Sequence, residues 1–244
     1  MLESGEMLEA HAVSVCFKGV NAVNNSNIVL RKTELLGLIG PNGAGKTTLI
    51  NVLSGYQNPT AGEVFLEGVC INGWPTYRIA RSGIARTFQA VRLFPHLSVL
   101  ENVEASMCHS RRGWRNRGKS ARRILEMLNL YAYANARADS LDYGDERRVG
   151  IARALACNPK YLLLDEPAAG LNHDEIEALI LMIQRIRDEL QFGVLVVEHN
   201  MKLIMNLCER IVVLRGGLTI AEGTPEEIKV NHEVLEAYLG DKSE

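Results

Sequence analysis

The sequence predicts an α/β protein, and three observations support this fold class. A glycine-rich loop lies between an apolar segment at residues 35–39 and a helix expected from Lys46 to Leu53. Continuous apolar runs, such as residues 161–164, are typical of strands buried on both faces of a sheet. Strand-like patterns disappear between Ala90 and about Pro159, where helical patterns replace them.

The glycine-rich loop has the spacing of a phosphate-binding loop, G-x-x-x-x-G-K-[ST]. Its residues are Gly40, Pro41, Asn42, Gly43, Ala44, Gly45, Lys46, Thr47 and Thr48. The glycines let backbone N–H groups point at a polyphosphate, and the N-terminus of the next helix favours an anion. Lys46 adds positive charge near the β and γ phosphates, and the Thr47 hydroxyl can bind Mg²⁺. We therefore expect nucleoside triphosphate binding rather than an ordinary glycine-rich turn.

Short strands without helices between them flank this loop. The alternation from Leu8 to Phe17 predicts an edge strand, and further strands are expected at residues 28–30 and 64–66. Together they predict an antiparallel β layer on the nucleotide side. Residues 84–88 predict one more strand, which ends at Gln89.

Residues 90–159 are expected to form an inserted helical lobe. Ser98 and Glu101 have the spacing of a capping box at the start of a helix. Residues 122–130 follow a second helical period. The basic run 111–119 favours a solvated loop, and contact with lipid headgroups or a membrane partner is the alternative.

The α/β pattern returns after Pro159. The expected strands cover residues 161–164, 194–197, 211–214 and 218–221, the last two joined by a turn at Gly216 and Gly217. An amphipathic helix is expected at residues 174–190. Thr224 is expected to cap a final helix, with proline and glutamate in its first turn.

The bulk composition is that of a soluble globular protein: 47% of the 244 residues are hydrophobic and 23% are charged. The net charge of -2 gives no electrostatic reason to expect nucleic acid. Five scattered cysteines predict reduced core residues rather than disulfides or a zinc site. The sequence has neither a signal-peptide pattern nor a long apolar run, so we expect any membrane role to come through a partner.

Polar residues follow three of the expected strands. Asp165 is expected to hold Mg²⁺ through its water shell, and Glu166 to orient or deprotonate the attacking water. An exposed turn is the alternative for this acidic pair. Gln89 and His199 alone would be unremarkable loop residues. Their placement at strand ends, beside the acidic pair and the phosphate loop, favours functional roles.

These motifs together resemble an ABC-type ATPase, the nucleotide-binding subunit of ABC transporters, from about Leu8 to Gly240. In chain order they are the phosphate loop, Gln89, Leu141-Asp142-Tyr143-Gly144-Asp145, Leu164-Asp165-Glu166-Pro167, Ala169-Gly170-Leu171-Asn172 and His199. The resemblance implies a P-loop NTPase core with an antiparallel β layer and an inserted helical lobe. The core is expected to be RecA-like and to cover 8–89 and 160–240, with the lobe at 90–159.

In this family two subunits close head to tail around ATP, and hydrolysis releases them. The resemblance implies that the signature segment, Leu141 to Asp145, contacts the nucleotide held by the other subunit. A helix expected at residues 146–156 would direct its N-terminus at the γ-phosphate. Gln89 is then expected to sense the γ-phosphate and to lie at the Mg²⁺, and His199 to bond the γ-phosphate or orient the water. Phe17 is expected to stack on adenine, with a plain core phenylalanine as the alternative.

Finer features resemble the ATPases of branched-chain (hydrophobic) amino-acid importers. They lie in residues 85–89, 92–94, 166–172, 197–205 and 237–240. This branch implies a second, non-identical ATPase, two membrane permeases, an external binding protein and a location at the cytoplasmic face of the cell membrane. Branched-chain amino acids are the leading substrates, and urea, short amides and aromatic or other carboxylates remain open.

A soluble ABC-type ATPase acting in DNA repair or translation is the alternative function. Such proteins carry a long coiled-coil insertion or two cassettes, and this chain has neither. A GTPase or small-molecule kinase fits less well, because the chain has no Asn-Lys-x-Asp guanine-reading motif.

The signature departs from the family pattern, which has serine at its second position and glutamine at its fifth. This chain has Asp142 and Asp145 there. An ionised aspartate accepts hydrogen bonds only, so it repels a γ-phosphate. Asp142 therefore turns away, is protonated, or belongs to the weaker site of an asymmetric pair, and we favour the last. Asn172 in place of aspartate is a smaller departure.

Overall fold

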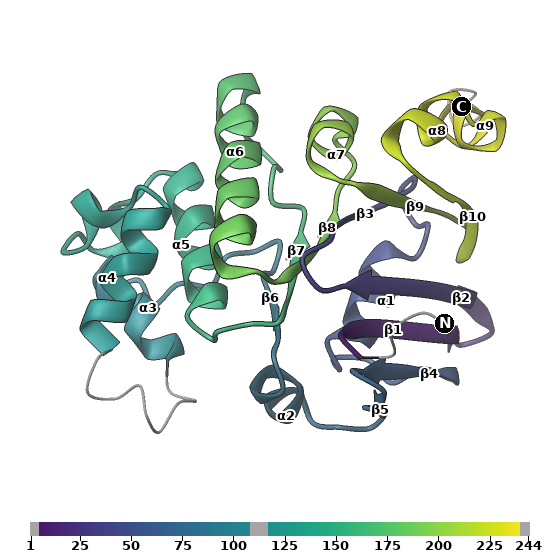
Figure 1. Cartoon of the computed structure of the whole chain (residues 1–244), viewed down its shortest axis with the longest axis horizontal. Helices are drawn as coiled ribbons and strands as arrows, with labels where there is room; N and C mark the ends of the chain where they lie inside the picture. The colour runs from purple at the N-terminus through teal and green to yellow at the C-terminus, as the bar shows by residue number, and fades with distance from the viewer. Residues whose placement is uncertain (1–4, 108–116, 240–244) are drawn as a thin grey trace.

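The structure, a computed structural model, describes residues 5–107 and 117–239. Its centre is a six-stranded sheet in the order β10-β9-β3-β8-β7-β6, accompanied by a four-stranded sheet in the order β2-β1-β4-β5 (Figure 1). All neighbours in the larger sheet are parallel except the β9–β10 hairpin, and the smaller sheet is antiparallel. The strands are β1 Met7–Phe17, β2 Val20–Arg31, β3 Leu35–Ile39, β4 Ala61–Leu66, β5 Val69–Cys70, β6 Ile84–Arg86, β7 Tyr161–Asp165, β8 Gly193–Val197, β9 Arg210–Arg215 and β10 Leu218–Gly223.

Helices cover both faces of the six-stranded sheet. Helices α6, α7 and α8 lie over one face, whereas α1 and the four-stranded sheet lie against the other (Figure 1). The helices are α1 Lys46–Leu53, α2 Thr76–Arg81, α3 Val99–Ser106, α4 Arg117–Met127, α5 Tyr143–Leu155, α6 His173–Leu190, α7 Met201–Leu207, α8 Pro225–Val230 and α9 His232–Leu239. The arrangement confirms the predicted α/β class with an antiparallel layer.

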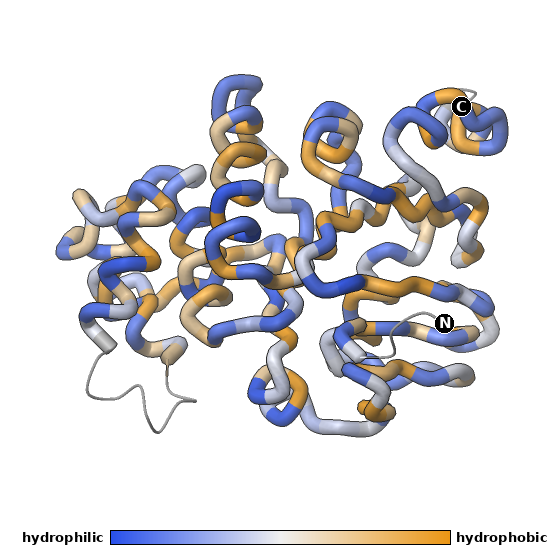
Figure 2. Tube along the Cα trace, viewed as in Figure 1, coloured by the Kyte–Doolittle hydropathy of each residue, from blue (hydrophilic) through white to orange (hydrophobic). Residues whose placement is uncertain are grey.

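The strands divide the apolar core into two clusters because their side chains alternate between the two faces. In β3, Leu36 and Leu38 pack with α1 and the antiparallel layer, while Leu35 and Ile39 pack with the helices of the opposite face. All five residues of β3 are buried. Figure 2 shows the hydrophobic residues gathered along the central strands, with hydrophilic and hydrophobic residues alternating along the helices. Burial on both faces explains why the central strands have continuous apolar sequences.

Helices α3, α4 and α5 pack together beside the sheet and contribute to the same core cluster as α6. The capping box at the start of α3 is present, with the Glu101 N–H donating to Ser98 Oγ and the Ser98 N–H donating to Glu101 Oε2. Between Ala90 and Pro159 the described residues form no strand, as predicted. Most of the basic run 111–119 lies outside the described residues.

Several expected details are wrong. β1 is an interior strand, paired with β2 and β4, and not an edge strand. β6 ends at Arg86 instead of reaching residue 88, although the Thr87 N–H still donates to Leu163 O at 2.9 Å. The helices α2, α7 and α9, of six, seven and eight residues, were not expected.

The cysteines differ in their surroundings. Cys16 and Cys70 are exposed and Cys208 is buried, so the expectation of core cysteines is wrong for the first two.

No helix among the described residues has the length and apolar character needed to span a membrane.

Asn102 ties the loop before α3 to the helix and carries a stability prediction. Its buried amide accepts from the Phe94 N–H and donates to the carbonyls of Phe94 and Ser98. Asn102→Ala removes these bonds and leaves the Phe94 N–H without its acceptor, so we expect a loss of about 1–3 kcal/mol in unfolding free energy by urea denaturation. Asn206→Ala, at an exposed site with one hydrogen bond, is the control and should cost less than ~0.5 kcal/mol. Equal losses would contradict this role.

Candidate functional site

The phosphate loop follows β3 and is held in place by backbone contacts. Gly40 has φ 150°, and a Cβ there would lie 2.1 Å from Leu214 O in β9. Gly45 has φ 102°, and a Cβ there would lie 2.3 Å from Ala22 O in β2. The Gly217 N–H, from the β9–β10 turn, donates to Ala44 O at 3.0 Å. The glycines are therefore needed for close backbone approach as well as for turning.

Lys46 is the first residue of α1 and is buried in the loop. Its ammonium donates to Gly40 O at 2.6 Å and to Pro41 O at 3.0 Å. Burial lowers the pKa of Lys46, while the charges of Glu166, Asp165 and Glu198 oppose this shift. A polyphosphate in the loop would add negative charge beside the ammonium and favour its charged form. Thr47, the next residue, is exposed.

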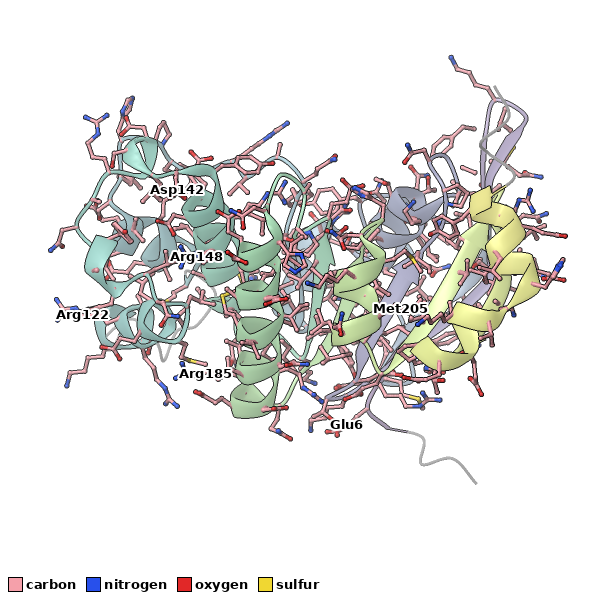
Figure 3. All side chains as sticks on the ribbon, turned by 90° about the horizontal axis from the view of Figure 1, so that it is seen from above. Glu6, Arg122, Asp142, Arg148, Arg185 and Met205 are labelled. Carbon is pink, nitrogen blue, oxygen red and sulfur yellow. The ribbon has the colours of Figure 1, made fainter. Side chains whose placement is uncertain are left out.

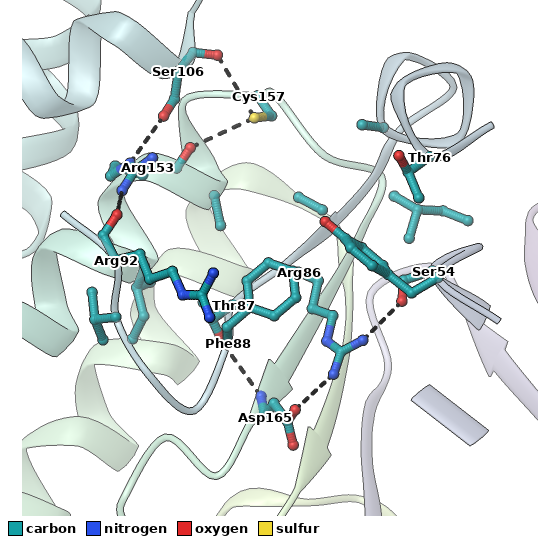
Figure 4. A pocket seen from close by; sticks show the side chains of 18 of the residues that line it. Ser54, Thr76, Arg86, Thr87, Phe88, Arg92, Ser106, Arg153, Cys157 and Asp165 are labelled. Atoms are coloured by element: carbon teal, nitrogen blue, oxygen red, sulfur yellow. Dashed lines mark hydrogen bonds and ion pairs between the residues drawn. The ribbon is translucent and has the colours of Figure 1, made fainter. Parts of the chain in front are cut away.

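Asp165 ends β7 with a buried carboxylate that faces Arg86 (Figure 4). Arg86 Nη2 donates to Asp165 Oδ2 at 2.8 Å. The Asp165 N–H donates to Thr87 Oγ1 at 3.3 Å. No site role for Arg86 was predicted from the sequence, although a charged residue within an apolar strand segment was the available signal.

Glu166, Gln89 and His199 come together at the ends of neighbouring strands. Gln89 Nε2 donates to Glu166 Oε2 at 2.6 Å, and His199 Nδ1 lies 3.9 Å from Glu166 Oε1. Glu166 has φ 47°, a left-handed conformation that is unusual for a residue other than glycine and is often found at functional sites. The expected convergence of these three side chains is therefore present in the structure.

Glu198 is hydrogen-bonded to the loops that carry Glu166 and His199, and it was not predicted as a site residue from the sequence. It is fully buried, and its carboxylate accepts from the Ala168 N–H at 2.8 Å, the His199 N–H at 2.9 Å and the Asn200 N–H at 3.1 Å. These bonds join the loop after β7 to the loop after β8. The sequence signal was an acidic residue directly after a buried strand, the same pattern as Asp165.

Arg147 of α5, also missed, connects the lobe to the loop after β7. Its guanidinium donates to Glu166 O and, at 2.6 Å, to Tyr143 Oη, and it lies over the Tyr143 ring. The buried guanidinium of Arg147 therefore links helix α5 to the backbone of Glu166.

The signature segment differs from the expectation in where its helix begins. α5 starts at Tyr143, not residue 146, and Asp142 is its N-cap, accepting from the Asp145 N–H at 2.7 Å. Asp145 is buried and pairs with Arg148; burial raises the pKa of Asp145, Arg148 opposes the shift, and Asp142 adds to it. Figure 3 shows Asp142 and Arg148 on the side of the molecule away from α8 and α9.

The structure does not bring every predicted site residue together. No hydrogen bond or ion pair among the described residues joins the segment Leu141 to Asp145 to the phosphate loop. Phe17 ends β1 and is 47% exposed, so the alternative of a core phenylalanine is wrong. In the signature segment Asp142 and Tyr143 are exposed, and the roles of these residues and of Phe17 remain predictions.

Comparison with known families gives two matches. Residues 23–169 match the family described as "ABC transporter", and residues 219–243 match one described as "Branched-chain amino acid ATP-binding cassette transporter".

Similar proteins match almost the whole chain. The high-affinity branched-chain amino acid transport ATP-binding protein BraF of Pseudomonas aeruginosa is 41% identical, over 98% of this chain and 99% of BraF. The corresponding LivG of Escherichia coli is 40% identical, with the same coverage. The lipopolysaccharide export system ATP-binding protein LptB of E. coli is 34% identical, over 96% of this chain and 97% of LptB.

Two solved structures share the fold. The ADP conformation of MJ1267, an ATP-binding cassette of an ABC transporter, is 28% identical with a TM-score of 0.87, covering 96% of this chain and 99% of that one. The dimeric cassette MJ0796, bound to ADP and Pi, is 29% identical with a TM-score of 0.80, covering 89% and 98%.

Two glycines of the phosphate loop provide a matched test of the backbone contacts. Gly43 has φ 78° and open space around it, so Gly43→Ala should cost only the left-handed conformation, about 1–2 kcal/mol. Gly40→Ala must also displace Leu214 O, which should cost about 1–3 kcal/mol more. Urea unfolding of both variants measures the difference. If Gly40→Ala is no less stable than Gly43→Ala, the close contact with β9 is not a constraint.

Proposed function

Because the chain belongs to the ABC transporter family, we propose that this ATPase powers an importer of branched-chain amino acids or related small amides or carboxylates. The observation that carries the proposal is the identity of about two fifths with BraF and LivG over nearly the whole chain. The match of residues 219–243 to a branched-chain amino acid cassette family supports the same substrates. The comparisons give no support to the alternative of DNA repair or translation.

ATP binding is assigned to the phosphate loop, with Lys46 beside the β and γ phosphates. The donors near it suit Mg²⁺, which prefers oxygen ligands, few carboxylates and substrate phosphates. Thr47 offers an exposed hydroxyl, Asp165 a carboxylate and Gln89 an amide oxygen. Mg²⁺ bound by these residues would neutralise charge on the phosphates.

Hydrolysis is assigned to Glu166. Its carboxylate accepts a hydrogen bond from Gln89, which orients it, and the imidazole of His199 lies 3.9 Å away. A carboxylate held at one place can take a proton from the attacking water or orient it. His199 remains 59% exposed and so is accessible to a γ-phosphate. The left-handed backbone of Glu166 is braced by Arg147 through its carbonyl.

A second ATPase subunit, which need not be identical, would complete each ATP site by presenting its signature segment. The N-terminus of α5 offers N–H groups and a favourable dipole to an anion. In this chain the charge of Asp142 already occupies that end of the helix. We therefore assign this signature segment to the weaker site of an asymmetric pair.

Two permease subunits and an external binding protein would complete the transporter and hold the chain at the cytoplasmic face of the membrane. We place the permease contact at a pocket of about 430 Å³ between the core and the α3–α5 helices. Exposed aromatic side chains line it, among them Tyr56, Tyr77 and Phe88. Aromatic rings of this kind are common in protein interfaces.

The catalytic assignment is tested by Glu166→Gln in the complex purified with its membrane subunits. ATP turnover should fall by ~10²–10⁴-fold because the proton acceptor is lost, while ATP binding persists. Glu189→Gln, an exposed pair with Arg185 at the end of α6, is the control and should hydrolyse normally. Normal turnover in Glu166→Gln would overturn the role, and a chain that purifies without membrane proteins would overturn the transporter assignment.

The signature assignment is tested by Asp142→Ser, which removes the charge and keeps a good N-cap. Like charges ~4 Å apart cost roughly 4 kcal/mol at an effective dielectric near 20, so removal should raise ATP turnover or nucleotide affinity in the complex. Asp142→Asn, which also keeps the cap, should act in the same direction. No change in either variant would remove the idea of a weakened site.

A further inference from the structure

The reaction described above gives no role to Arg86, although its ion pair with Asp165 is buried at the site. Both side chains are less than a tenth exposed, at 6% and 8%. Arg86 holds Oδ2 of Asp165, and Oδ1 accepts no hydrogen bond from the described residues. We propose that Arg86 is a positioning residue for the magnesium site, which fixes one oxygen of Asp165 so that the other faces the metal. This inference rests on the proposed function, because it takes Asp165 as a metal ligand.

The guanidinium of Arg86 is itself fixed from a second direction. Its Nη1 donates to Asn51 Oδ1 at 2.6 Å and to Ser54 Oγ at 3.1 Å. Asn51 lies in the last turn of α1 and Ser54 is its C-cap, where the helix dipole favours a cation. Arg86 therefore connects the far end of the phosphate-loop helix to the carboxylate at the end of β7 (Figure 4).

Two aromatic rings complete the surroundings of Arg86. The guanidinium carbon lies 4.9 Å from the Phe88 ring centre and 5.7 Å from that of Tyr56. The two rings contact each other edge to face, with centres 5.2 Å apart. Such rings attract a cation and restrict its movement. Hydrogen bonds and rings together leave the guanidinium little freedom, as a positioning role requires.

A simpler role would be that of a counter-charge, since no other cation among the described residues pairs with the Asp165 carboxylate. Lysine distinguishes the two roles. It keeps the charge, but it is a point charge on a flexible stem and cannot reproduce the forked contacts with Asp165 and Asn51. A positioning role predicts that lysine fails, whereas a counter-charge role predicts that lysine suffices.

The test uses Arg86→Lys and Arg86→Gln in the full-length Glu166→Gln protein, which should bind but not hydrolyse ATP. Affinity for a fluorescent ATP analogue is measured in EDTA and at increasing MgCl₂. Affinity in EDTA should stay within about twofold of the parent. The Mg²⁺ concentration for half-maximal tightening should rise about tenfold or more in both variants, as is typical when a group that orients a metal ligand is lost.

Two further variants complete the design. Asn51→Ala keeps the charge of Arg86 and removes its anchor, so it should shift the Mg²⁺ requirement in the same direction by a smaller factor. It also carries the test if Arg86→Gln does not fold. Arg185→Gln, on the exposed face of α6, should leave the requirement unchanged.

The outcomes separate this inference from the proposed function. A parent whose nucleotide affinity is independent of Mg²⁺ overturns the proposed magnesium site and this inference with it. A Mg²⁺-dependent parent with Arg86→Lys at the parent's requirement, or with Asn51→Ala unchanged, overturns the positioning role alone.

Discussion

The parallel register of β3, β8, β7 and β6 is the constraint on which the site depends. Asp165 is paired with Val197, and Arg86 with Leu163, so the carboxyl ends of the four strands lie side by side. The segments that follow these strand ends contain the phosphate loop, Gln89, Glu166 and His199. A slip of one residue would turn the side chain of Asp165 to the opposite face. Side chains as much as 79 residues apart in sequence meet only because this register is kept.

Buried charged side chains connect the loops that follow these strands. The carboxylate of Glu198 accepts hydrogen bonds from three backbone N–H groups of two loops, and Arg147 donates to the carbonyl of Glu166. Arg86 satisfies Asp165 from the neighbouring strand. A buried charge without a partner is costly, so each of these groups holds its partner in one place. The hydrogen bonds that offset the cost of burying these charges also set the geometry of the site.

The sequence predicted the layers, the phosphate loop and the convergence of Gln89, Glu166 and His199, because these follow from local patterns and from strand ends. It did not predict the partners of buried charges. The distant partners of Arg86, Arg147 and Glu198 lie 19 to 79 positions away in the chain, and nothing in the sequence around these three residues specifies those partners. It also placed the start of α5 three residues late, because Asp142 was read as a departure from a motif rather than as a helix cap.

The contact between the phosphate loop and the β9–β10 hairpin has a mechanical consequence. Leu214 and Gly217 touch the loop through backbone atoms, and the hairpin leads directly into α8 and α9. Gly217 has φ 82° and a Cβ there would lie 3.0 Å from Ala22 O, so the contact tolerates exchange of exposed side chains in β10 but not of this turn glycine. A longer or shorter turn would move the backbone of Leu214 and Gly217 and displace the phosphate loop that they contact. Substitutions of exposed residues in β10 are therefore expected to be tolerated, whereas changes at the turn glycine or in the length of the turn are not.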